Sequence, residues 1–290
     1  MSGKILVTGA SGQLGHLAIE ALLKRVPAEQ IVAGARATGK ADDLAARGVE
    51  VREVDYDRPE TLNQALNGID KLLLISSSEL GRRAAQHRNV IDAAKQAQVK
   101  LLVYTSVLHA DTSVLGLAGE HRDTEAALKA SGVPAVLLRN GWYSENYTAS
   151  LSTALEHGAL LGSAGEGRIS SAARRDYAEA AAVVLTSGEE QAGKVYELAG
   201  DTAYSLKELV QEVTGQSGKD VVYQDMPMED YKNVLIEVGL PEPLASLLAD
   251  SDAGAAQGAL YDQGGTLSRL IGHPPTPMSE SVAEALASAP

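Results

Sequence analysis

Three glycines with the spacing G-x-x-G-x-x-G, at positions 9, 12 and 15, lie between a short apolar run and a segment with helical periodicity. Residues 5–7 are typical of a strand buried on both faces, and apolar residues recur at helical spacing over 14–22. Glycine allows a tight turn and a close approach of the backbone to a ligand. A helix start presents unpaired N–H groups and the positive end of its dipole. The pattern predicts a pyrophosphate-binding turn. An ordinary loop is the alternative, because the usual spacing is G-x-G-x-x-G.

Arg36 follows a predicted strand at residues 31–35. It lies 21 residues beyond Gly15, near the position at which an acidic residue would bind the ribose 2′-hydroxyl of NAD. A guanidinium can bind a 2′-phosphate with two hydrogen bonds. We therefore expect a cofactor that carries this phosphate. A solvated arginine at a strand end is the alternative.

Polar residues also follow the predicted strands at residues 49–54 and 71–75. Asp55 can accept a hydrogen bond from an adenine amino group or cap the helix that follows, and the sequence leaves both interpretations open. The serines at 76, 77 and 78 form either a hydroxyl-lined ligand edge or a turn. Their place at the carboxyl end of a strand favours the ligand edge, because ligands of parallel sheets bind there.

Strands and helices are predicted to alternate through the first half of the chain. We expect strands at residues 5–7, 31–35, 49–54, 71–75, 101–105 and 133–139, and helices at 14–26, 41–47, 57–67, 82–97 and 123–130. Helices of this length between strands imply right-handed crossovers. The pattern predicts an α/β fold with a doubly wound, parallel, Rossmann-like sheet.

The second half of the chain is less regular. We expect helices at residues 176–185, 205–213, 229–238, 243–249 and 279–287, and strands at 195–198 and 221–223. Ser205 and Glu208 form a capping box at the start of one helix. We predict a nucleotide-binding domain at 1–140 and a smaller C-terminal α/β substrate lobe at 141–290, from which some segments return to the sheet. This lobe is expected to cover the carboxyl edge of the sheet.

Composition argues against several classes of function. The net charge of −13 disfavours a nucleic-acid partner, since phosphate binding needs a basic face. There is no cysteine and the six histidines form no ligand pair, so we expect no metal site. We expect a cytoplasmic protein without membrane insertion, because no apolar run has membrane-spanning length and the N-terminus is a strand. The sequence decides neither the oligomeric state nor the reason why Phe is absent.

Five parts of the chain carry a resemblance to a known family. They are TGASGQLG at 8–15, Arg36, LLLISSSE at 72–79, YTS at 104–106 and LRNGWYSENY at 138–147. Together they resemble the NmrA-like group of atypical short-chain dehydrogenases/reductases. Within that group the chain is most similar to the bacterial type 2 NAD(P)H:quinone oxidoreductases, and less so to the triphenylmethane reductases. The similarity runs to LIGHP at 270–274, nearly the whole chain.

The resemblance implies NADPH binding by four parts of the chain. These are Gly9, Ala10, Ser11, Gly12, Gln13 and Leu14; Arg36; Ser76, Ser77 and Ser78; and Asn140, Gly141, Trp142, Tyr143, Ser144 and Glu145. The implied activity is the reduction of quinones to hydroquinones by direct hydride transfer. The alternatives are a non-catalytic, redox-sensing regulator that binds NADP and a protein partner, or a reductase of triphenylmethane-type dyes.

The Tyr-x-x-x-Lys pair of fully equipped short-chain dehydrogenases is missing, since no Tyr is followed four residues later by Lys. The corresponding region holds His121 and Glu125, and a Glu raises the pKa of a neighbouring acid. His109 and His121 could donate protons, although an isolated histidine is more often a surface or packed residue. We therefore identify no catalytic acid. Reduction of a quinone does not require a catalytic acid, because the phenolate left by hydride transfer has a pKa of about 10 and water can protonate it.

Four residues are candidates for positioning a quinone. Trp142, Tyr143 and Tyr147 could stack on a flat ring as aromatics with a polar handle, and core packing is their alternative role. Ser106 follows the predicted strand at 101–105. Its hydroxyl could donate to a quinone oxygen or cap the strand end.

Overall fold

The computed structural model describes residues 3–288, and the chain forms two compact units. The first unit comprises the chain up to residue 110 together with 120–140 and 174–196. The second comprises 111–119, 141–173 and the chain from 197 onward. Each unit is therefore assembled from segments that are separated in the sequence.

A seven-stranded sheet runs through the first unit in the order β3-β2-β1-β4-β5-β6-β8. Its strands are β1 (Lys4–Val7), β2 (Ile31–Ala35), β3 (Glu50–Glu53), β4 (Ile69–Leu74), β5 (Leu101–Val107), β6 (Ala135–Asn140) and β8 (Val195–Leu198). The chain steps outward from β1 to β3 and then crosses to the other side of β1 with β4, so the winding reverses between β1 and β4. The predicted doubly wound parallel sheet is confirmed.

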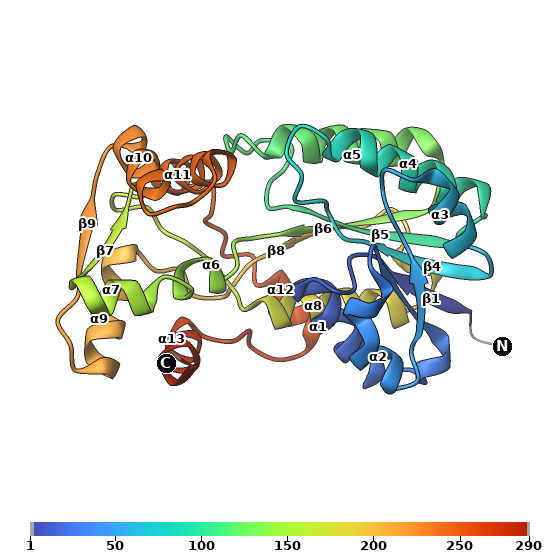
Figure 1. Ribbon diagram of the computed structural model, residues 1–290, viewed down its shortest axis with the longest axis horizontal. Coiled ribbons are helices and arrows are strands. Elements are labelled where there is room, and N and C mark those ends of the chain that lie inside the picture. The colour runs from blue at the N-terminus through green and yellow to red at the C-terminus, as the bar shows by residue number, and fades with distance from the viewer. Residues whose placement is uncertain (1–2, 289–290) are drawn as a thin grey trace. The chain divides into compact units, whose positions relative to one another are not determined.

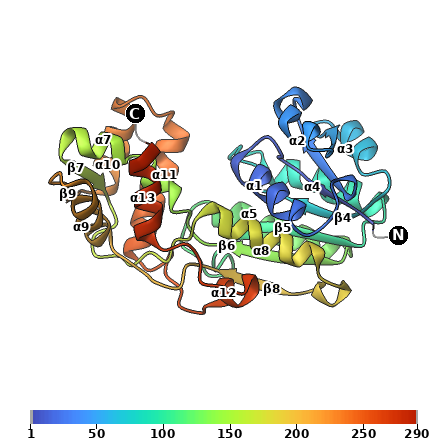
Figure 2. The same ribbon diagram turned by 90° about the horizontal axis from the view of Figure 1, so that it is seen from below.

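Helices cover both faces of this sheet (Figure 1). On one face lie α1 (Gln13–Leu23) and α8 (Arg174–Thr186), which pack side by side (Figure 2), and on the other α3 (Pro59–Ala65), α4 (Arg83–Gln96) and α5 (Ala118–Ser131). The remaining elements are α2 (Asp42–Ala46) and three 3₁₀ turns, η1 (Ala28–Gln30), η2 (Thr38–Ala41) and η3 (Glu189–Gln191). Because helices cover both faces, the central strands need apolar residues on both sides, and residues 5–7 of β1 and 101–104 of β5 are indeed continuous apolar runs.

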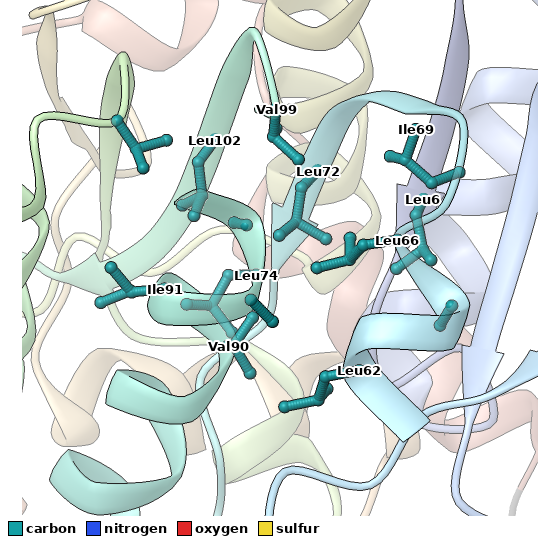
Figure 3. Close-up of a cluster of buried hydrophobic side chains, with 14 of the residues drawn as sticks. Leu6, Leu62, Leu66, Ile69, Leu72, Leu74, Val90, Ile91, Val99 and Leu102 are labelled. Carbon is teal, nitrogen blue, oxygen red and sulfur yellow. The ribbon is translucent and has the colours of Figure 1, made fainter. Parts of the chain in front are cut away.

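One hydrophobic cluster fills the space between the sheet and α3 and α4. Leu72 and Leu74 of β4 and Leu102 of β5 gather with Leu62 of α3 and Val90 of α4 (Figure 3). These five side chains are at most 2% exposed. Full burial of a Leu or Val side chain stabilises a fold by about 1.5–3 kcal/mol. This cluster therefore holds β4 and β5 in place against α3 and α4.

The second unit has a parallel strand pair, β7 (Ala159–Gly162) with β9 (Val222–Asp225), and several helices. The helices are α6 (Glu145–Thr148), α7 (Leu151–His157), α9 (Leu206–Ser217), α10 (Met228–Glu237), α11 (Glu242–Ala256), α12 (Thr266–Ile271) and α13 (Met278–Ser288). The predicted capping box at the start of α9 is confirmed. Ser205 Oγ accepts from the backbone N–H of Glu208 at 3.2 Å, and the Glu208 carboxylate accepts from the Ser205 N–H at 2.7 Å.

The structure differs from the predicted elements mainly in this second unit. Strand β7 and the helices α6, α7 and α12 were not predicted, and α11 continues to Ala256, beyond the predicted end at residue 249. In the first unit α5 begins at Ala118, before the predicted start at residue 123. β7 is the four-residue segment ALLG, and its partner β9 begins more than 60 residues later. A pairing of two short, distant segments leaves no local periodicity to read.

Candidate functional site

The turn between β1 and α1 forms the first wall of the site. Gly9 has φ +60°, a left-handed conformation that favours glycine. At Gly15 a Cβ would lie 2.2 Å from the backbone oxygen of Gly9, so the close approach of helix and turn requires glycine. Gly12 is the N-cap residue of α1, no side chain caps this helix, and its first turn carries no acidic residue. The start of α1 is therefore suited to an anionic ligand.

A cavity of about 250 Å³ lies in the first unit beside this turn, at the carboxyl ends of β1, β2, β3 and β4. It is lined by Gly9, Ser11, Gly12, Arg36, Val54, Asp55, Tyr56, Ile75, Ser76, Ser77, Ser78, Glu79 and Gln86. The cavity is located where the winding of the sheet reverses, and ligands of doubly wound sheets bind at such switch points. The structure thus brings together the glycine turn, Arg36, Asp55 and the three serines.

Three further turn residues do not line this cavity. Ala10 is fully buried and its N–H donates to the backbone oxygen of Gly34 at 3.0 Å. Leu14 is buried in the core, and Gln13 is exposed as the first residue of α1. Ala10 and Leu14 therefore hold the turn in place.

Five residues of the cavity lining were missed by the sequence analysis: Val54, Tyr56, Ile75, Glu79 and Gln86. Val54 and Tyr56 flank Asp55, and Ile75 and Glu79 lie within LLLISSSE, so their neighbourhood in the sequence was a usable signal. Gln86 reaches the cavity from α4, and only the packing of that helix places it there.

The serine loop after β4 is fixed by its backbone. The N–H of Ser76 donates to Thr105 Oγ1 at 2.9 Å, and the N–H of Ser77 donates to His87 Nε2 at 2.9 Å. Arg83 Nε donates to the Ser77 backbone oxygen at 2.7 Å. These three bonds hold the backbone of Ser76 and Ser77 in place beside the cavity.

His87 is the buried acceptor that holds this loop. Its Nε2 accepts from Ser77, so Nδ1 carries the ring proton and faces Thr124 Oγ1 at 2.9 Å. Burial, and then the nearby Arg83 guanidinium, lower the pKa of His87 to about 3. The imidazole is therefore neutral at physiological pH and acts as a hydrogen-bond acceptor, which sequence analysis had not assigned to it.

Arg36 and Asp55 are charged residues of the cavity lining that follow the neighbouring strands β2 and β3. The Arg36 side chain is 69% exposed, and its Nη1 donates to Glu79 Oε1 at 2.8 Å. Asp55 Oδ1 accepts from the backbone N–H of Asp57 at 3.0 Å. The N-cap residue of α3 is Arg58, and no side chain caps this helix. The helix-capping interpretation of Asp55 was therefore wrong, and its carboxylate closes a local turn beside the cavity.

Ser106 at the end of β5 belongs to a buried polar cluster. Its Oγ donates to Glu125 Oε1 at 2.6 Å, and Arg139 binds the same carboxylate with Nε at 3.0 Å and Nη2 at 2.7 Å. The side chains of Glu125 and Arg139 are 12% and 9% exposed. Glu125 is thus neutralised by Arg139, and the hydroxyl proton of Ser106 is already donated to it.

The two candidate histidine proton donors have different surroundings. His121 is buried, with Nδ1 2.7 Å from the hydroxyl of Tyr104. Burial is the main cause that lowers the pKa of His121 well below its ordinary value, so the ring is neutral and packed. His109 lies in the turn after β5 with φ +53°.

Asn140 is the last residue of β6, and residues 141–145 follow it directly. Asn140 is 5% exposed, and its Oδ1 has no hydrogen-bond partner among residues 3–288. The backbone of Trp142 and Ser144 pairs with Ala172, whose N–H donates to the Trp142 oxygen at 3.2 Å and whose oxygen accepts from the Ser144 N–H at 2.9 Å. Trp142 is 9% exposed. A buried amide oxygen of this kind calls for a donor from outside the described chain.

The other members of this segment are also positioned by the backbone. The N–H of Gly141 donates to the Leu198 oxygen at 2.7 Å, and Tyr143 forms an isolated bridge with Ala172. Ser144 Oγ lies 2.9 Å from Ser171 Oγ. Tyr143 and Glu145 are half-buried, and Glu145 begins α6. None of residues 140–145 lines the cavity of the first unit.

Tyr147 is packed inside the second unit, at 7% exposure. Its hydroxyl donates to Asp252 Oδ1 at 3.0 Å, and Asp252 Oδ2 accepts from the backbone N–H of Ser163 at 3.1 Å. Burial is the main cause that raises the pKa of Tyr147 well above its ordinary value and that of Asp252 to about 6. This hydroxyl is therefore a donor to Asp252 at physiological pH.

Over residues 3–288 no group of three or more His, Asp or Glu side chains is placed to hold a metal ion. No helix in the same residues is both long and apolar enough to cross a membrane.

Comparisons with known proteins agree over nearly the whole chain. The model of the NmrA-like family matches residues 1–270. Quinone oxidoreductase 2 of Escherichia coli (strain K12) is 59% identical over 278 residues, which cover 96% of this chain and 97% of that protein. Among solved structures, an NADPH-dependent quinone oxidoreductase from Escherichia coli in complex with NADPH superposes with a TM-score of 0.94 at 58% identity, covering 97% of this chain and 99% of that one. The triphenylmethane reductase of Citrobacter sp. complexed with NADP(H) superposes with a TM-score of 0.93 at 40% identity, covering 97% and 100%.

Proposed function

The chain belongs to the NmrA-like family, and we propose that it reduces quinones to hydroquinones with NADPH by direct hydride transfer. The observation that carries the proposal is the 59% identity to a quinone oxidoreductase over 96% of the chain. The same observation favours an enzyme over the non-catalytic regulator.

The cavity of the first unit has the chemistry that NADPH requires. We assign the pyrophosphate to the turn from Gly9 to Leu14, where a Cβ at Gly15 would strike the backbone and the start of α1 has no side-chain cap. Arg36 is assigned to the 2′-phosphate and Asp55 to the adenine amino group, and the three serines after β4 are assigned to the same cofactor.

We assign residues 140–145 to the same cofactor. The support is Asn140, whose buried Oδ1 needs a donor that the described chain does not supply. NADPH, when bound, supplies the hydride. Trp142 and Tyr143 are proposed to hold the flat quinone by stacking, and Tyr147 can take part only through its ring, since its hydroxyl is engaged by Asp252.

Water is the proposed source of the last proton. The Ser106 hydroxyl donates to Glu125 and His121 is neutral and packed, so neither is a ready acid. A phenolate has a pKa of about 10, and water can protonate it near neutral pH. The work of the chain is then to orient the reacting rings, which can supply roughly 7 kcal/mol or more of the barrier reduction. A cytoplasmic location is part of the proposal, because NADPH is an intracellular reductant.

The test is NADPH oxidation with 1,4-benzoquinone, followed by the loss of NADPH absorbance. We expect a quinone-dependent rate that is higher with NADPH than with NADH. Gly12→Val tests the turn: its Cβ would lie 3.2 Å from the Gly9 backbone oxygen, and the variant should fold and lose both cofactor binding and activity. Tight NADPH binding by the unmodified protein with no reduction of any quinone would contradict the enzyme and support the regulator.

A further inference from the structure

The Arg36 guanidinium is already paired with a carboxylate of the cavity lining. Its Nη1 lies 2.8 Å from Glu79 Oε1, and the two side chains are 69% and 30% exposed. Both residues line the same cavity. A phosphate that binds Arg36 therefore approaches the negatively charged Glu79 carboxylate.

Glu79 is fixed in this position from its other side. Its Oε2 accepts from Arg82 Nη1 at 3.1 Å and from Gln86 Nε2 at 3.0 Å, and its backbone N–H donates to Ser77 Oγ at 3.1 Å. Arg82 and Gln86 are themselves held by Asp57, at 2.8 Å and 3.0 Å. Two side-chain donors besides Arg36, namely Arg82 and Gln86, therefore hold the carboxylate at the cavity, so its place does not depend on Arg36 alone.

This arrangement treats the two nicotinamide cofactors differently. A ribose 2′-phosphate carries up to two negative charges and must either displace Glu79 from Arg36 or lie close to its carboxylate, and like charges in proximity repel. A ribose 2′-hydroxyl brings no charge, so NADH leaves the Arg36–Glu79 pair intact. Resting on the proposed NADPH site, we propose that Glu79 is a specificity-determining residue that limits the preference for NADPH by occupying Arg36.

Glu79→Gln removes the negative charge and keeps nearly the same shape. Its single amide oxygen can still accept from Arg36, while the acceptor that faces Arg82 and Gln86 is lost with the charge. Exposed ion pairs are weak, and releasing one corresponds to a gain of about two- to fivefold in affinity. Glu79→Gln should therefore tighten binding of a 2′-phosphorylated ligand by about two- to fivefold and leave the unphosphorylated ligand unchanged.

The test is calorimetric titration of the full chain with adenosine 2′,5′-bisphosphate and with adenosine 5′-monophosphate. Glu60→Gln is the matched control, since it removes a carboxylate from another surface pair, Arg58–Glu60 at 2.9 Å, outside the cavity lining. We expect the bisphosphate to bind more tightly to Glu79→Gln only. We also expect this gain to shrink in an Arg36→Ala background, where there is no guanidinium left to release.

The outcomes separate this inference from the proposed function. If the unmodified protein prefers the bisphosphate but Glu79→Gln binds it equally or less tightly, Glu79 orients Arg36 and the inference is overturned alone. An equal gain with and without Arg36 also overturns it, because Glu79 then acts by repulsion without occupying Arg36. No preference for the bisphosphate in the unmodified protein removes the proposed role of Arg36, and the inference with it.

Discussion

Two buried carboxylates, one in each unit, have opposite surroundings. Glu125 in the first unit is bound by both Nε and Nη2 of Arg139 and accepts from Ser106. Asp252 in the second unit accepts from the Tyr147 hydroxyl and the Ser163 N–H, which are neutral donors. A cation compensates the burial of the first carboxylate. The second has only neutral donors, and its pKa rises to about 6.

Glu125 and Asp252 thus illustrate that burial favours the neutral form of a titratable group unless an opposite charge is buried with it. His87 follows the same rule from the basic side, since burial lowers its pKa to about 3. Between pH 3 and 6.5 the unfolded chain then binds more protons at His87 than the folded chain, so this group makes stability rise with pH. Asp252 has the opposite sign between about pH 4 and 6, because there the folded chain binds more protons.

The largest effect is expected from breaking the compensated pair. Glu125→Ala leaves the Arg139 guanidinium buried without its carboxylate, which costs about 3–5 kcal/mol of folding free energy. Urea unfolding at neutral pH measures it. Glu60→Ala removes an exposed carboxylate and should change the unfolding free energy little. A loss at Glu125 no larger than at Glu60 would show that the Arg139–Glu125 ion pair is not desolvated.

The next effect concerns Asp252 and depends on pH. Asp252 contributes about 3 kcal/mol to the free energy of unfolding through its raised pKa. This stabilisation is fully present below pH 3.8 and is lost as the pH rises through about 6. The unmodified protein should therefore lose stability relative to Asp252→Asn between pH 4 and pH 7.5. Urea unfolding at both pH values gives the difference, with Asp230→Asn on the exposed side of α10 as control. Parallel pH profiles for the unmodified protein and Asp252→Asn would mean that Asp252 is charged when buried.

The Arg36–Glu79 pair of the first unit is exposed, in contrast to Arg139–Glu125, and should affect binding more than folding. Arg36→Ala removes a charge-assisted contact to the 2′-phosphate, worth about 1.5–3 kcal/mol. NADPH should bind at least about tenfold more weakly, with the NADH affinity and the unfolding free energy nearly unchanged. Titration with both cofactors tests this. Equal losses for NADPH and NADH would refute the assignment of Arg36.

The smallest effect is expected at Ser106, because its proton serves the buried cluster. Ser106→Ala should reduce kcat with benzoquinone less than about tenfold, well below the 10²–10⁴-fold typical of a general acid. The rate should change little between pH 6 and 8, because His87 and His121 stay neutral there. Steady-state kinetics across that range are the measurement. A hundredfold loss at unchanged NADPH affinity would place Ser106 among the catalytic residues.

The sequence by itself determined the features that depend on neighbouring residues. The sequence analysis predicted the glycine turn after β1, the alternation of strands and helices, and the capping box of α9. Each of these features depends on residues that are close together in the sequence. The cavity lining by Arg36, Asp55 and Ser76 to Ser78 followed from the rule that carboxyl ends of parallel strands meet at one edge.

The contacts between polar groups that are far apart in the sequence could be identified only from the tertiary structure. Glu79 lies 43 residues from Arg36, and Asp252 lies 105 residues from Tyr147. The sequence predicts that Glu125 raises the pKa of a neighbouring acid, but it does not show that Arg139 of β6 binds its carboxylate. Strand and helix periods specify which face a side chain takes but not which side chain of another element lies opposite, and electrostatics depends on that second fact. The protonation of buried groups, and the anion that Arg36 faces, were therefore set by packing.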